Sequence, residues 1–264
     1  IGSDDFGTKI KKEFQEINVP TEYIETSYDK DTSFSFILIN KGTGSRTVFN
    51  VATEHPPLKK LNYDFTPDII FTDGHDYGAT QNAISKYQNA ITIIDAGRVT
   101  PELLELCKYI KYIVCSKGFA ETVTGLKFDF SNPSSLVAVY NKLQDKYPNS
   151  NIVITLEENG CLYTSGNEIK IMPGLKIQAV DTTGAGDIFH GAFTYGIANN
   201  FDMEKIITLS NIAAGLSVTK IGARLSVPNL SEVLDYYSKK MNNQVNGQTN
   251  IPANNNQGNM PNAN

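Results

Sequence analysis

The residues best suited to chemistry form one short run, DTTGAGD, at Asp181–Asp187. Gly184 and Gly186 permit a tight turn with positive φ and let the backbone approach a ligand closely. Apolar residues at helical spacing follow, which predicts a helix from 188 to 199. A helix N-terminus presents unpaired amide groups and positive partial charge, so it suits an anion such as phosphate. Asp187 stands at the mouth of that site, where a carboxylate can remove a hydroxyl proton.

Spacing alone leaves a second interpretation open, in which the run is a capped helix start with Asp187 as its N-cap. The nearby His190 does not decide between an anion site and a capped helix start. His190 lies three residues beyond Asp187 on the same helical face. Because buried histidines more often serve packing than catalysis, a packing role is the favoured interpretation of His190.

A regular alternation of apolar strands and helices surrounds this run. Strands are predicted at 68–72, 90–94, 111–115 and 151–156, followed by meander strands at 161–164 and 168–172. Helices are predicted at 5–17, 79–88, from Thr100, 118–124, 134–146, 188–199, 203–220 and 230–240. The pattern predicts an α/β fold, a doubly wound and mostly parallel sheet with helices on both faces.

Polar side chains lie at or just after the predicted strand ends, namely Asp73, Asp95, Ser116 and Asp181. In a doubly wound sheet, ligands bind at the carboxyl ends of the strands. This common placement predicts a single crevice. Arg98 follows one of these strands, and either a phosphate contact or a surface ion pair would explain it.

Composition narrows the class of protein. The 264 residues are 40% hydrophobic, which is enough for a large core. A net charge of −5 argues against a general binder of nucleic acids or anionic membranes. The three cysteines lack C-x-x-C spacing and indicate reduced core thiols in a cytoplasmic protein. No apolar run approaches a membrane span, and residues 241–264 read as a disordered tail rich in Asn and Gln.

The run DTTGAGDIF resembles the second signature of the PfkB (ribokinase-like) carbohydrate and nucleoside kinases. The resemblance implies that Asp187 is the general base and that the amides of Gly184, Ala185 and Gly186 form the anion hole. The start of the chain, residues 1–7, resembles the family's vG-x-D-x-fG segment, which normally lies some way into the sequence. The first strands, the sugar-holding aspartate and the first signature are therefore expected to be missing.

On this resemblance, residues 1–240 form an N-terminally incomplete kinase domain. A hairpin at about 33–50 would belong to a small β lid over the sugar, through which the protein would form a homodimer. Asp73 matches an acidic sugar-binding residue, although a solvated turn residue before Gly74 explains it equally well.

The nucleotide positions of the family are matched with two departures. Ser116 matches the asparagine of the N-x-x-E phosphate and magnesium motif, but Phe119 occupies the place of its glutamate. That departure resembles the ketohexokinase-like branch more than ribokinase. The segment 155–160, TLEENG, resembles the T-L-G-x-x-G nucleotide loop that includes Thr155 and Gly160, with Glu157 replacing its first glycine. Asn211 matches a position that faces the adenosine.

The resemblance also implies a potassium site beside the anion hole. The matching positions are Asp181, Thr183, Ser217, Lys220, Gly222 and Ser226. Most of these residues would bind through backbone carbonyls, and oxygen ligands suit a hard cation.

The favoured function is ATP-dependent phosphorylation of a sugar hydroxyl, with Mg²⁺ as cofactor and K⁺ as an additional cation. The alternative is a non-catalytic sugar or nucleotide binder on the same fold, which the Glu157 and Phe119 departures motivate. An NAD oxidoreductase is disfavoured because no G-x-G-x-x-G follows an early strand. The identity of the sugar does not follow from these residues.

Overall fold

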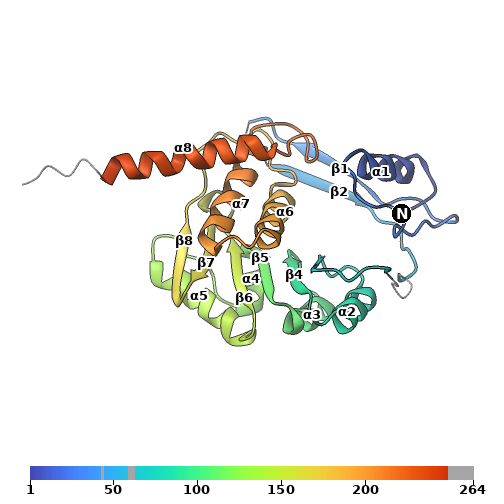
Figure 1. The fold of residues 1–264 in the computed structure, drawn as a ribbon, viewed down its shortest axis with the longest axis horizontal. Helices are drawn as coiled ribbons and strands as arrows, with labels where there is room; N and C mark the ends of the chain where they lie inside the picture. The colour runs from blue at the N-terminus through green and yellow to red at the C-terminus, as the bar shows by residue number, and fades with distance from the viewer. Residues whose placement is uncertain (43–44, 59–62, 249–264) are drawn as a thin grey trace, which may run out of the picture.

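The computed structural model describes residues 1–42, 45–58 and 63–248, and a six-stranded sheet lies between two layers of helices (Figure 1). The sheet contains, in spatial order, β3 (Ile69–Thr72), β4 (Ile91–Ala96), β5 (Tyr112–Ser116), β6 (Asn151–Thr155), β7 (Cys161–Ser165) and β8 (Glu168–Met172). The first four strands are parallel, and β7 and β8 complete the sheet as an antiparallel meander. The predicted α/β fold with a mostly parallel sheet is confirmed.

One face of the sheet is covered by the helices that connect its parallel strands (Figure 1). These are α2 (Tyr77–Lys86), α3 (Pro101–Leu106), α4 (Lys117–Thr124) and α5 (Pro133–Lys146). Thr100 caps α3 as predicted, because its hydroxyl accepts from the Leu103 amide at 3.2 Å. Ile94, Ile113 and Ile152 point from the strands into this layer.

The opposite face carries α6 (Ala185–Ala198) and α7 (Met203–Ser217). Ile93, Val114 and Val153 point toward these helices and pack with Phe193. Since successive side chains on a strand point to opposite faces, two covered faces require nearly continuous apolar strands. This requirement explains the apolar runs seen in the sequence.

The last helix, α8 (Leu230–Gln248), packs on α7 through Val233, which contacts Leu209 and Ile212. It continues past residue 240 into the first part of the predicted disordered tail, so the predicted start of that tail is wrong. Each further residue in a formed helix adds a hydrogen bond, and none of residues 241–248 is a proline. Residues 249–264 of the predicted tail lie outside the described residues.

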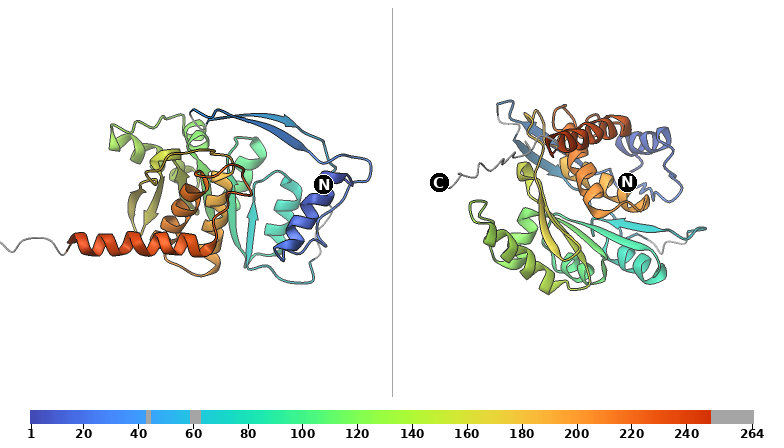
Figure 2. Two further views of the ribbon diagram at one scale, coloured as in Figure 1. Left: turned by 90° about the horizontal axis from the view of Figure 1, so that it is seen from above. Right: turned by 60° about the vertical axis from the view of Figure 1, so that its left-hand side comes forward.

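The N-terminal part forms α1 (Asp5–Glu16) and a hairpin of β1 (Phe34–Ile39) with β2 (Arg46–Val51). The hairpin is a separate two-stranded sheet beside the main one, as both views in Figure 2 show. The predicted hairpin is confirmed, while its role as a lid and a dimer interface stays a prediction. Within the described residues, no helix is both long and apolar enough to cross a bilayer.

Asp4 joins the start of α1 to the chain that leads into the hairpin. Its carboxylate accepts hydrogen bonds from the Gly7 amide, the Thr32 amide and the Thr32 hydroxyl, at 2.7 to 2.8 Å. The Thr32 hydroxyl, followed by the two amides, lowers the pKa of Asp4. Gly7 lies so close to Gly2 that an added Cβ would sit 2.1 Å from the Gly2 carbonyl oxygen. The G-x-D-x-x-G spacing at the start of the chain therefore has a packing reason.

Candidate active site

The glycine-rich run forms the turn that opens α6. Gly184 is the N-cap residue with φ of 78°, and an added Cβ would lie 2.8 Å from the Cβ of Ala223. The prediction of positive φ is thus right for Gly184, whereas Gly186 lies inside the helix without positive φ. Asp187 is in the first helical turn and is not the N-cap, so the capped-helix interpretation of this carboxylate is wrong.

The first-turn amides of α6 differ in how fully they are engaged. The Ala185 amide donates to the Thr182 carbonyl at 3.3 Å, which closes the turn. Gly186 and Asp187 follow it, where an α-helix leaves its amides without intrahelical partners. Asp187 is exposed on the same turn. The turn therefore offers amide donors for an anion and a carboxylate for a proton within one helical turn.

Asp181 holds this turn against the loop that connects α7 to α8. Its side chain is buried and accepts from the Thr183 amide and the Gly222 amide, both at 2.9 Å. The Asp181 amide also donates to the Val218 carbonyl at 3.2 Å. The predicted cation positions at 181–183 and 217–226 are thus brought together in two adjoining loops.

One buried side-chain oxygen in these loops, that of Thr183, is of particular interest. The Thr183 hydroxyl is buried and makes no hydrogen bond within the part of the chain that the structure describes. No cluster of three or more His, Cys, Asp or Glu side chains suited to a metal occurs among the described residues. A cation here would therefore be held by neutral oxygens rather than by a set of carboxylates.

A cavity of about 760 Å³ adjoins the turn and is lined by four of the predicted nucleotide residues, Thr155, Glu157, Gly160 and Asn211. Thr182, Ala185 and Gly186 line the same cavity, so the glycine-rich turn and the nucleotide positions face one space. Ser45, in the described part of the hairpin turn, also lines it.

Glu157 occupies a position built for glycine. It has φ of 57° at the start of the short 3₁₀-helix Glu157–Asn159, in the left-handed region that L-residues rarely adopt. Its carboxylate lies 3.6 Å from Lys117 Nζ at the surface. Gly160 has φ of 91°, and an added Cβ would lie 2.0 Å from the Met172 carbonyl oxygen. Both positions at which the family's nucleotide loop has glycine thus have positive φ in this protein, although only Gly160 is a glycine here.

Asn211 is positioned by contacts that its sequence context did not indicate. Its amide nitrogen donates to the Met172 carbonyl at 3.3 Å. Cys161 is buried beside it; burial raises the pKa of this thiol to about 12, with a hydrogen bond to Asn211 acting in the opposite direction. The Asn211 side chain is therefore fixed at the wall of the cavity.

Ser116 does not line the nucleotide cavity. Its hydroxyl caps α4 by accepting from the Phe119 amide at 3.1 Å. Phe119 is 1% exposed and belongs to the core under the sheet. The residue that replaces the family's glutamate is thus a packing residue and offers no ligand to the cavity.

Three carboxylates gather at the carboxyl edge of the sheet. Burial raises the pKa of Asp95, the charges of Asp187 and Asp73 raise it further, and those of His190 and Arg98 lower it. Asp73 also accepts from the His75 amide at 2.9 Å, as expected of a turn residue. Asp73 and Asp187 therefore lie near enough to Asp95 for their charges to act on it, while the single crevice expected at the strand ends stays a prediction. The strand-end position was the only sequence signal for Asp95.

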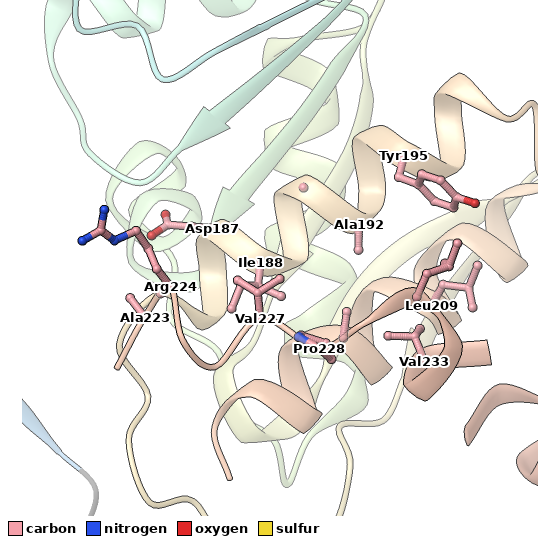
Figure 3. Close-up of a pocket in the computed structure, with 14 residues that line it drawn as sticks. Asp187, Ile188, Ala192, Tyr195, Leu209, Ala223, Arg224, Val227, Pro228 and Val233 are labelled. Carbon is pink, nitrogen blue, oxygen red and sulfur yellow. The ribbon is translucent and has the colours of Figure 1, made fainter. Parts of the chain in front are cut away.

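A second cavity, of about 480 Å³, lies on the other side of Asp187 among α6, α7 and α8 (Figure 3). Figure 3 shows Asp187 and Arg224 at one end, with Ile188 and Val233 farther along its mostly apolar wall. Arg224 pairs with Glu13 of α1. A sugar needs hydrogen-bond partners around its hydroxyls, so this apolar cavity is a poor match for one.

A family model described as pfkB family carbohydrate kinase matches residues 1–230. The chain belongs to the pfkB family. Among relatives of this pfkB protein, the ribokinase of Lactococcus lactis is 27% identical over 248 residues, covering 88% of this chain and 76% of the relative. A solved ribokinase from Thermotoga maritima has a TM-score of 0.72 and 25% identity, covering 90% and 79% of the two chains.

A solved ribokinase from Arabidopsis thaliana, complexed with ribose and ATP, has a TM-score of 0.70 and 19% identity, covering 89% of this chain and 79% of that one. At that identity the likeness concerns the fold alone. The family match and the shared fold confirm the resemblance that the DTTGAGDIF run carried, and they place the chain among the pfkB carbohydrate kinases.

Proposed function

We propose that the protein transfers the γ-phosphoryl group of ATP to a sugar hydroxyl, with Asp187 as general base. The observation that carries the proposal is the first turn of α6, where Asp187 follows amides that adjoin a cavity of about 760 Å³. Family membership supports the phosphoryl transfer and the sugar class of the acceptor. ATP as donor is supported by the ribokinase of similar fold that was solved with ribose and ATP.

The nucleotide would lie in that cavity, between the segment 155–160 and Asn211. Its terminal phosphate would meet the amides of Gly184, Ala185 and Gly186, where helix partial charge and unpaired donors stabilise an anion. The Ala185 amide would give up its 3.3 Å contact with Thr182 to take part. Thr155 borders the same space, with its hydroxyl anchored to the Cys115 carbonyl at 3.3 Å.

The proton transfer would occur on the other side of the phosphate. A hydroxyl of the sugar would sit against Asp187, whose carboxylate accepts the proton as the hydroxyl oxygen attacks in line. Asp73 would accept a hydrogen bond from another hydroxyl of the sugar, since its charge, like that of Asp187, acts on Asp95 at the carboxyl ends of the strands. The hairpin would close over the site and exclude water, and Ser45 already borders the nucleotide cavity.

The two implied cations fit the residues differently. Phe119 supplies no carboxylate to the cavity, so no protein ligand is assigned to Mg²⁺, which would accompany the phosphates of the nucleotide. The buried Thr183 hydroxyl, which has no hydrogen-bond partner among the described residues, and the adjoining loop 217–226 suit a monovalent cation such as K⁺. Bound there, a cation would add positive charge beside the anion-binding turn.

The test measures turnover of the purified protein with ATP and a panel of pentoses, deoxypentoses and hexoses. A coupled assay monitors the release of ADP. The proposal predicts sugar-dependent ADP release with at least one member of the panel. Calorimetric titration with ATP and each sugar runs in parallel. Binding of both ligands without ADP release would contradict the proposal and support the alternative of a non-catalytic binder.

A further inference from the structure

His190 lies one helical turn beyond the Asp187 turn, and its side chain is only 5% exposed. Its Nδ1 is 2.7 Å from the carbonyl oxygen of Gly186, in the first turn of α6. Its Nε2 is 3.1 Å from the carbonyl oxygen of Val114 on β5 and 3.5 Å from Oδ1 of Asp95 on β4. One imidazole thus joins the anion-binding turn to two strands of the sheet.

The hydrogen-bond partners of the ring are all acceptors. A carbonyl oxygen accepts and has no proton to give, so a hydrogen bond to Gly186 or to Val114 is made through a ring N–H. The tautomer decides which nitrogen donates, and a protonated ring would donate from both nitrogens at once. The Asp95 carboxylate lies beside Nε2, where it would stabilise that protonated form. Aromatic rings also lie near it, among them Phe71 of β3 at 6.1 Å between ring centroids.

The position of this pair concerns the reaction directly. Gly186 immediately precedes Asp187, so the bond from His190 to the Gly186 carbonyl fixes the part of the backbone that carries both the amides and the base. The bond to Val114 ties that backbone to β5, an interior strand of the sheet, across 76 residues of sequence. Without the ring, the start of α6 would keep only its helical bonds and its contacts with the loop after α7.

We propose that His190 and Asp95 act as a positioning pair for the phosphoryl transfer. The His190 ring holds the turn of Gly184 to Asp187 against the sheet. This inference rests on the proposed function, because it assigns the pair a role relative to Asp187 as base. The sequence favours a packing role for His190, because packing histidines are commoner than functional ones; its partners Val114 and Asp95 lie on other elements and are not visible in the spacing.

The charge of the pair adds to the geometry. Asp73 follows β3, Arg98 follows β4 and Asp187 lies in the first turn of α6, and the charges of all three act on Asp95 near the end of β4. His190 is buried beside Asp95. When protonated, its ring would offset the carboxylate charge beside the place where a phosphoryl group must pass.

The experiment compares His190→Ala, His190→Asn and Asp95→Asn with the unaltered protein. His190→Ala is expected to lower kcat by about 10²-fold, because a displaced turn misplaces base and anion hole together, while KM for ATP stays within about threefold. His190→Asn retains an amide donor and should recover most of that loss. If His190→Ala does not fold, the pH profiles of the two Asn variants carry the test alone.

The pH profiles separate a charged pair from simple packing. If the ring is protonated during turnover, His190→Asn removes a positive charge near the base, and the acid limb of kcat should move to higher pH by about 0.5–1 unit. Asp95→Asn removes a negative charge and should move that limb to lower pH. Unmoved limbs in both variants would overturn the inference.

Asp187→Asn serves as the reference. If it is inactive while the His190 and Asp95 variants match the unaltered protein, only the positioning inference fails. If Asp187→Asn keeps full turnover, the proposed function itself fails.

Discussion

Glu157 combines a strained backbone with a charge at the edge of the nucleotide cavity, and its replacement by glycine should improve both stability and ATP binding. Left-handed φ destabilises an L-residue by about 1–2 kcal/mol, and glycine avoids this cost. Glycine in turn raises the conformational entropy of the unfolded chain, which offsets about 0.5–1 kcal/mol of that stabilisation. The net gain is about 0.5–1 kcal/mol. In a chain of this size, that gain raises Tm by about 1–4 °C.

The effect on ATP follows from charge. A carboxylate about 8 Å from a phosphate, at an effective dielectric constant of about 40–80, repels it by about 0.5–1 kcal/mol. Removing Glu157 also frees Lys117, now 3.6 Å from the carboxylate, to attract the nucleotide. Both changes act in the same direction, so KM for ATP should fall about two- to fivefold.

Glu157→Gln is the matched control, because it removes the charge and keeps the left-handed side chain. It should lower KM for ATP as glycine does but leave Tm within about 1 °C, since the exposed pair with Lys117 contributes little. Differential scanning calorimetry and initial rates at varied ATP give the two readouts. A lower Tm in Glu157→Gly, or an unchanged KM in both variants, would refute the reasoning.

Two further predictions concern stability. Gly160→Ala should lower the free energy of unfolding, measured by denaturant titration, by at least about 2 kcal/mol, because left-handed φ and a Cβ 2.0 Å from the Met172 carbonyl oxygen act together. The control is Gly191→Ala, whose added methyl group would lie in open space on α6. In the same titration it should be neutral or stabilising by up to about 1 kcal/mol. Asp4→Asn should lower Tm at pH 7. Hydrogen bonds lower the pKa of Asp4 in the folded protein, so the charged carboxylate stabilises the fold above its ordinary pKa of about 3.8. This stabilisation is lost as the pH falls through the lowered pKa, so the difference in Tm between Asp4→Asn and the unaltered protein should shrink below pH 4. A difference in Tm that stays constant with pH would contradict stabilisation by the charged carboxylate.

Local patterns in the sequence were enough to predict most elements and the reactive turn. The spacing of apolar residues that marks a strand or a helix can be read within a short window of the sequence. The DTTGAGD run likewise contains both the turn and the start of the helix that follows it. The predicted positive φ at Gly184 follows from the same local chemistry. These features are independent of contacts between distant segments.

The parts that could not be predicted depend on such contacts. His190 owes its role to Val114 and Asp95, which come from other elements of the fold. Phe119 matched a ligand position in the family pattern, yet in the fold it fills the core. The departure at Glu157 motivates the alternative of a non-catalytic binder, and the structure adds a backbone constraint at this residue that spacing does not reveal.

The central claim is that Asp187 takes the proton of the acceptor hydroxyl, and Asp187→Asn tests it most directly. The amide keeps the size of the side chain and the first turn of α6, but it does not act as a base. Calorimetry should show ATP binding within about threefold of the unaltered protein, while kcat with an accepted sugar falls by about 10²–10⁴-fold. Unimpaired ATP binding with near-normal kcat in this variant would contradict the account.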